Sequence, residues 1–127
     1  MGKKRVFQTE EAAITGGPYS QAIIHNDLIY VSGQIAVDPK TNQMALGTIE
    51  EESELALENI RIILEEAGSS LDKVLKVTAY LLDMEEFSGF NEVYKRYFQK
   101  DLPARVCIQA GKLPFGARIE IDAIACL

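Results

Sequence analysis

Hydrophobic and polar residues alternate with two different periods along this chain of 127 residues. Short segments with a two-residue period predict strands at 4–8, 21–25, 28–34, 74–82, 104–110 and 117–126. Two intervening segments repeat their apolar residues every three or four positions, which is typical of helices with one buried face.

The first helix is marked at both ends. Thr48 followed by Glu51 forms a capping-box pattern, and Gly68 supplies a stop after a run of apolar positions that ends at Ala67. The second helix is expected to begin near Asp83, and its apolar face carries four aromatic residues, Phe87, Phe90, Tyr94 and Phe98.

The element order predicts one α/β (α+β) domain over residues 1–127. Three strands are followed by a helix, a strand, a second helix and two further strands. Because each helix lies between strands and has a single apolar stripe, we expect both helices to cover one face of a single mixed sheet, with right-handed crossovers.

Strand alternation divides the sheet residues into two sets, because successive side chains point to opposite faces. The aliphatic set, for example Ile119 and Ile121 or Val106 and Ile108, is expected to meet the helices. The opposite set mixes aromatic, aliphatic, hydroxyl and charged residues. Such a face is too apolar for solvent and too polar for a dry core, so we expect a partner subunit to cover it in a homo-oligomer.

Arg105 and Glu120 fall in this mixed set on consecutive strands, and we expect them to be neighbours on that face. Two interpretations stay open for the pair. It is either a structural salt bridge or the polar part of a ligand pocket.

Composition and charge exclude several classes of protein. The formal charge is −6 and the pI is near 4.8, without the basic face and interleaved aromatics of a nucleic-acid binder. No apolar run is long enough to span a membrane, and no apolar segment follows Lys3, Lys4 and Arg5 to make a secretory signal. Two cysteines are too few for a disulfide scaffold, which favours the reducing cytoplasm.

Metal and cofactor chemistry also finds little support. His25, the single histidine, lies beside a predicted turn and has no ligand spacing to the two cysteines. Gly16-Gly17-Pro18 lacks the lysine and hydroxyl residue of a phosphate-binding loop. We therefore expect neither a metal nor a cofactor.

The C-terminal third resembles the signature of the Rid (YjgF-type) family. The resemblance rests on the run from Pro103 to Leu113, followed after five residues by Ile119-Glu120-Ile121. Three other segments agree with the family: 17–22, 31–34, and Phe90-Asn91 together with Tyr94. The resemblance covers essentially the whole chain.

This resemblance implies a chorismate-mutase-like (YjgF-like) fold and a homotrimer with clefts between subunits. It also implies cofactor-free hydrolysis of 2-iminopropanoate and 2-iminobutanoate to 2-oxo acids and ammonium. Arg105 would bind the planar substrate carboxylate, and Glu120 would position and deprotonate water. The residues that match the family's cleft lining are Tyr19, Ser32, Gly33, Asn91 and Cys107.

Two other functions remain open at this point. The chain could be a non-catalytic trimer that binds small carboxylates in the same clefts and acts as a regulator. It could also be an endoribonuclease and translation inhibitor, a family theme that the acidic charge disfavours.

Overall fold

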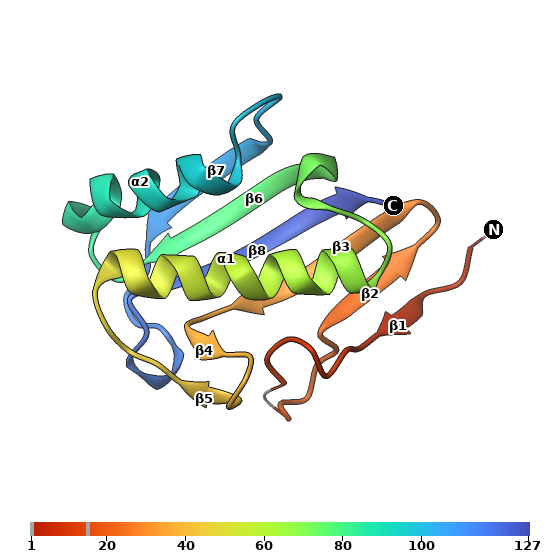
Figure 1. The fold of residues 1–127 in the computed structure, drawn as a ribbon, viewed down its shortest axis with the longest axis horizontal. Helices are drawn as coiled ribbons and strands as arrows, with labels where there is room; N and C mark the ends of the chain where they lie inside the picture. Colours follow the sequence, from red (N-terminus) through yellow and green to blue (C-terminus); the bar gives the residue numbers. More distant parts are fainter. Residues whose placement is uncertain (1, 15) are drawn as a thin grey trace.

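A computed structural model describes residues 2–14 and 16–127, and it has two layers (Figure 1). The main sheet contains six strands, namely β1 (Arg5–Phe7), β2 (Ala22–His25), β3 (Leu28–Gln34), β6 (Val74–Leu81), β7 (Ala104–Gln109) and β8 (Ile119–Cys126). Helices α1 (Ile49–Glu66) and α2 (Phe87–Tyr97) both lie on one face of this sheet (Figure 1). The predicted fold class is confirmed, and so is the order of its eight principal elements.

Five short elements were not expected from the sequence. Strands β4 (Val37–Asp38) and β5 (Gln43–Met44) form a separate two-stranded hairpin, and three short 3₁₀ helices lie at Leu71–Lys73, Met84–Glu86 and Pro114–Gly116. The last of these precedes β8, which therefore begins at Ile119, whereas the sequence pattern placed its start at 117.

Helix α1 begins as the sequence predicts. The Thr48 hydroxyl accepts from the Glu51 amide at 3.1 Å, and the Glu51 carboxylate accepts from the Thr48 amide at 2.9 Å. These two bonds satisfy two backbone donors that the first helical turn would otherwise leave unpaired. Gly68, at φ +90°, follows the helix in a left-handed conformation that favours glycine.

Strand order in the main sheet is β1-β2-β3-β8-β6-β7. All neighbours are antiparallel except β6 and β7, which are parallel and are joined through α2. The pairing of β3 with β8 shifts register between Val31 and Gln34, so an irregularity falls at Ser32 and Gly33. Such bulges re-aim side chains at the point where they occur.

The aliphatic faces of the inner strands pack under the helices, as expected. Val77, Ala79, Ile119 and Ile121 are each almost completely buried there. Leu75 is an exception to the predicted alternation, because a register shift between Val74 and Lys76 leaves it 49% exposed. The opposite face of the sheet carries no helix from the described residues, and it is called the open face below (Figure 1).

Candidate active site

A cavity of about 370 Å³ lies beside the bulge in β3. It brings together four of the predicted site residues, Tyr19, Ser32, Gly33 and Glu120. Its other described lining residues are Ala13, Ile14, Gly16 and Gly17, the polar residues Gln8, Gln21 and Gln34, and an apolar group made of Ile35, Val37, Pro114 and Phe115. This volume falls within the usual range for a small-molecule site.

Gly33 allows the Glu120 side chain to lie against the backbone of β3. A Cβ atom built at Gly33 would lie 2.8 Å from Cδ of Glu120 and closer still to its carboxylate oxygen. Any larger residue would therefore have to displace the carboxylate. Glycine at this position thus makes room for a charged side chain to lie against the strand, and its φ is not in the left-handed region.

Ser32 fixes the segment that carries Tyr19. Its hydroxyl donates to the Ser20 carbonyl at 2.6 Å, and its amide donates to the Gln21 carbonyl at 3.0 Å. Tyr19 itself is 53% exposed at the cavity. The Ser32 hydroxyl therefore positions the cavity wall. Because its O–H already donates to the Ser20 carbonyl, it has no second proton to donate to a ligand.

Two features of its surroundings raise the pKa of Glu120. Partial burial raises the pKa of the Glu120 carboxyl above its ordinary value, and the nearby Asp122 carboxylate raises it further. Both effects disfavour the charged form. Asp122 in turn accepts a 3.3 Å hydrogen bond from the Tyr80 hydroxyl, from the strand next to β8.

A second group of predicted site residues surrounds Arg105 on β7. The Arg105 guanidinium donates to Oδ1 of Asn91 at 2.8 Å, and its Cζ lies 4.6 Å from the ring centroid of Tyr94. The rings of Phe90 and Phe87 lie at 5.4 and 5.6 Å. The aromatic face of α2 thus holds the guanidinium in one orientation through cation–π contacts and one hydrogen bond.

Cys107 is half-buried beside this group. Burial raises the pKa of the Cys107 thiol, and the charge of Arg105 only partly offsets that effect. A thiol whose pKa is raised is a poor nucleophile at neutral pH. Cys107 packs against the main hydrophobic cluster, and its role as a wall of the site stays a prediction.

The expectation that Arg105 and Glu120 are neighbours on one face is wrong. Arg105 pairs with Val77, whose side chain is buried under the helices, whereas Glu120 pairs with Tyr80 on the open face. β7 is an edge strand, and the face of β7 that points toward the helices lies beside the aromatic rings and Asn91 of α2. The Arg105 guanidinium binds there. The aliphatic residues of β7, Val106 and Ile108, consequently point away from the helices, where they are 43% and 47% exposed.

The predicted site residues therefore form two separate groups in one protomer. The acid group is Tyr19, Ser32, Gly33 and Glu120 at the cavity, and the arginine group is Asn91, Arg105 and Cys107 beneath α2. Strands β8 and β6 lie between β3 and β7, which further separates the two groups. No structural salt bridge links Arg105 to Glu120 within the described part of the chain.

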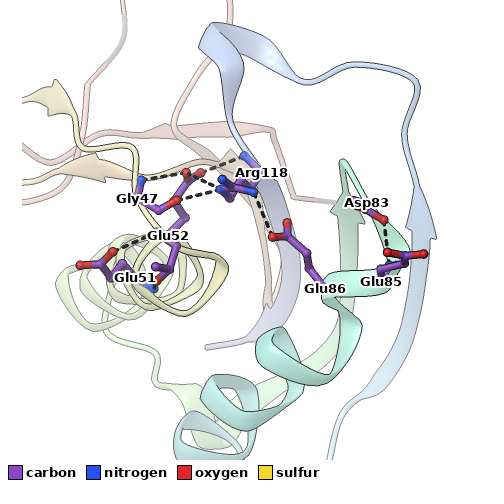
Figure 2. Close-up of polar contacts among 8 residues, drawn as sticks. Gly47, Glu51, Glu52, Asp83, Glu85, Glu86 and Arg118 are labelled. Carbon is purple, nitrogen blue, oxygen red and sulfur yellow. Dashed lines mark hydrogen bonds and ion pairs between the residues drawn. The ribbon is translucent and has the colours of Figure 1, made fainter.

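Sequence reasoning missed a buried carboxylate that binds the residue after the 114–117 turn, whose Pro114 and Phe115 line the cavity. Figure 2 shows Glu52, which is 1% exposed, between the Gly47 amide and Arg118. Glu52 accepts from the backbone amide of Arg118 at 2.8 Å, and the Arg118 guanidinium donates to the Gly47 carbonyl at 2.8 Å and to Glu86 at 2.9 Å. This cluster joins α1, the 3₁₀ helix at 84–86 and the start of β8.

Other candidate chemistry is sparse in the described residues. His25 is exposed at the turn between β2 and β3. Across residues 2–14 and 16–127, no three His, Cys, Asp or Glu side chains are grouped as metal ligands would be. In the same residues, no helix is both long and apolar enough to cross a membrane.

Comparison with known proteins gives a consistent result across the chain. The family model described as "Endoribonuclease L-PSP" matches residues 9–127. A RutC family protein of Pyrococcus abyssi is 48% identical over 96% of this chain and 96% of its own. A protein of Capra hircus named 2-iminobutanoate/2-iminopropanoate deaminase is 45% identical over 96% of this chain and 89% of its own.

Solved structures agree with the fold. A crystal structure from Thermotoga maritima superposes with a TM-score of 0.93 at 46% identity, covering 97% of both chains. The E. coli protein TdcF, solved with bound serine, has a TM-score of 0.91 at 34% identity and covers 97% of this chain and 98% of its own.

Proposed function

Because this chain belongs to the endoribonuclease L-PSP family, also called the YjgF/Rid family, we propose that it is a hydrolase. The reaction that we propose is the deamination of 2-imino acids. The observation that carries the proposal is the Glu120 carboxyl, whose pKa is raised by burial, at the wall of a cavity large enough for a small ligand. Relatives named 2-iminobutanoate/2-iminopropanoate deaminase support it, among them that of Homo sapiens at 44% identity.

We propose that the working site lies between two copies of the chain in a homotrimer. One copy supplies the arginine group and its neighbour supplies the acid group, because the two groups lie on opposite faces of a single sheet. The exposed apolar residues of the open face, which include Tyr30, Val106 and Ile108, support burial against another copy. A ring of identical contacts would form one site at each interface.

In this composite site, Arg105 binds the substrate carboxylate. The guanidinium is already oriented by Asn91 and Tyr94, so its remaining N–H groups can meet a planar carboxylate without a further loss of side-chain freedom. The bound serine of TdcF, an amino acid with the same α-carboxylate, supports a ligand of this size and charge.

Glu120 acts on the water. It accepts a proton from water as the water oxygen bonds to C2 of the imine, and it returns the proton to the nitrogen. In the resulting carbinolamine, Glu120 takes the hydroxyl proton and passes it to the amino group, so that the C–N bond breaks as the C2–O double bond forms, which releases ammonia and leaves the 2-oxo acid. Because the imine carbon is already electrophilic, holding the water against it supplies much of the acceleration that is needed. The two free cysteines fit a reducing cytoplasm as the site of this reaction.

A ribonuclease function finds less support. The described residues that line the cavity include no lysine or arginine to hold phosphates, and the one histidine is exposed at a turn. The deciding experiment is ammonia release from 2-iminopropanoate and 2-iminobutanoate generated in the assay, with and without the protein. We expect faster release with wild type than with Glu120→Gln. Equal rates with wild type, with Glu120→Gln and with no protein would reject the deaminase and leave the non-catalytic binder.

A further inference from the structure

Phe115 is an exposed aromatic residue in a backbone conformation that aromatic residues rarely adopt. Its φ is +56° and its ψ is +24°, within the left-handed region, and its side chain is 72% exposed. The other described non-glycine residues at positive φ are Asn26, Asn42 and Asp101, which are the types that tolerate this region. Neither local backbone preference nor burial in the protomer explains a phenylalanine here.

The position of Phe115 at the cavity does supply an explanation. Phe115 lines the same cavity as Glu120, together with the apolar residues Pro114, Val37 and Ile14. The cavity therefore has a polar part, where Glu120 and Ser32 lie, and an apolar part around Phe115. Strained backbone conformations cluster at active sites and ligand contacts, so the position of Phe115 beside Glu120 indicates a role in binding.

The loop that carries Phe115 is anchored at its base. The Ala117 amide donates to the Pro114 carbonyl at 3.1 Å, and Ala117 is fully buried in a small apolar cluster with Ile35 and Val37. The next residue, Arg118, is held by the buried Glu52 and by Glu86 (Figure 2). The aromatic ring is thus presented by a fixed loop and not by a mobile one.

From this arrangement we propose that Phe115 contacts the substrate side chain and selects 2-imino acids with branched or aromatic apolar side chains over those with a methyl group. The inference rests on the function proposed above. With the carboxylate at Arg105 of one copy and C2 beside Glu120 of the next, the side chain of the substrate lies against the apolar part of the cavity. A methyl group leaves that part in contact with water, whereas a larger apolar group displaces the water.

The test compares the imines derived from leucine and alanine in wild type and in Phe115→Asn. Asparagine tolerates the left-handed conformation, so this variant keeps the loop and removes the ring. We expect wild type to prefer the leucine-derived imine, and the ratio of the two kcat/KM values to fall about tenfold in Phe115→Asn. Leu46→Asn is the matched control, because Leu46 is also exposed, lies near Gly116 and is not among the cavity residues. Its ratio should equal that of wild type.

Binding of the corresponding 2-oxo acids separates this inference from the deaminase proposal. The Kd values of 4-methyl-2-oxopentanoate and pyruvate are measured by calorimetry on the same proteins. If imines are hydrolysed but neither ratio depends on Phe115, the inference is wrong and the deaminase stands. If no imine is hydrolysed but the larger oxo acid binds more tightly in a Phe115-dependent manner, the deaminase is wrong, and the contact of Phe115 with the apolar side chain of the ligand stands. Absence of both activities overturns both.

Discussion

Replacing Arg105 by lysine keeps a positive charge and removes the planar guanidinium, so this change separates charge from shape. In the structure the guanidinium is oriented by the 2.8 Å bond to Asn91 and by the ring of Tyr94 at 4.6 Å. A lysine ammonium cannot offer two parallel N–H groups to a carboxylate, nor can it stack in the same way. We therefore expect Arg105→Lys to fall well below wild type and to restore only part of the activity that Arg105→Ala loses.

The expected loss follows from the bonds removed. Losing one of two charge-assisted hydrogen bonds to the substrate carboxylate costs about 1.5–3 kcal/mol. That range corresponds to a roughly 10- to 150-fold lower kcat/KM. Arg105→Ala loses both bonds and the charge, and its kcat/KM should be at least about tenfold lower again.

The assay is ammonia release from 2-iminobutanoate, with the assembly state of each variant measured on the same preparation. Arg96→Lys is the matched control, because Arg96 lies on α2 with its side chain exposed. It should retain wild-type kcat/KM. A correctly assembled Arg105→Lys variant within twofold of wild type would refute the carboxylate-binding role.

Three other predictions follow from the same structure. Burial raises the pKa of the Glu120 carboxyl, so the folded protein holds a proton there that the unfolded chain releases at lower pH, and wild-type stability falls as pH rises from the ordinary glutamate pKa through the raised one. In denaturant unfolding, Glu120→Gln should therefore gain stability relative to wild type as the pH rises above about 4, and parallel pH curves would contradict this. Glu52→Ala leaves the backbone amides of Gly47 and Arg118 unpaired, so it should lower the free energy of unfolding by about 3 kcal/mol. The control Glu54→Ala removes an exposed carboxylate and should change the free energy of unfolding by less than about 0.5 kcal/mol. Exhaustive chelation should leave imine hydrolysis unchanged, and a loss that a divalent ion restores would contradict the cofactor-free site.

Features set by neighbouring residues were predictable from the sequence. The capping box at Thr48 and Glu51 and the two-residue alternation of β8 depend on local geometry alone, and both are observed. The face occupied by Arg105 was not predictable in this way. Alternation separates two sets of residues, but which set meets the helices depends on contacts with Asn91 and Tyr94 on α2.

The anchoring cluster could not be predicted for a similar reason. Glu52 follows Glu50 and Glu51, and three acidic residues in a first helical turn are typical of a solvated helix N-terminus. Its burial depends on Arg118, which lies 66 residues away in the sequence. The Pro114-Phe115-Gly116 sequence indicates a turn, and a phenylalanine at a turn position with positive φ is unusual enough to have drawn attention to Phe115.

Subunit complementation tests the central claim, a site built from two copies, most directly. Arg105→Ala and Glu120→Gln are each expected to be nearly inactive alone. If Arg105 of one copy works with Glu120 of the next in a ring, random mixing of the two variants restores wild-type pairs at roughly one quarter of the interfaces. We therefore expect about a quarter of wild-type ammonia release after the two proteins are unfolded and refolded together, and none when each is refolded alone. Mixed trimers, verified by mass spectrometry, that regain no activity would contradict the composite site.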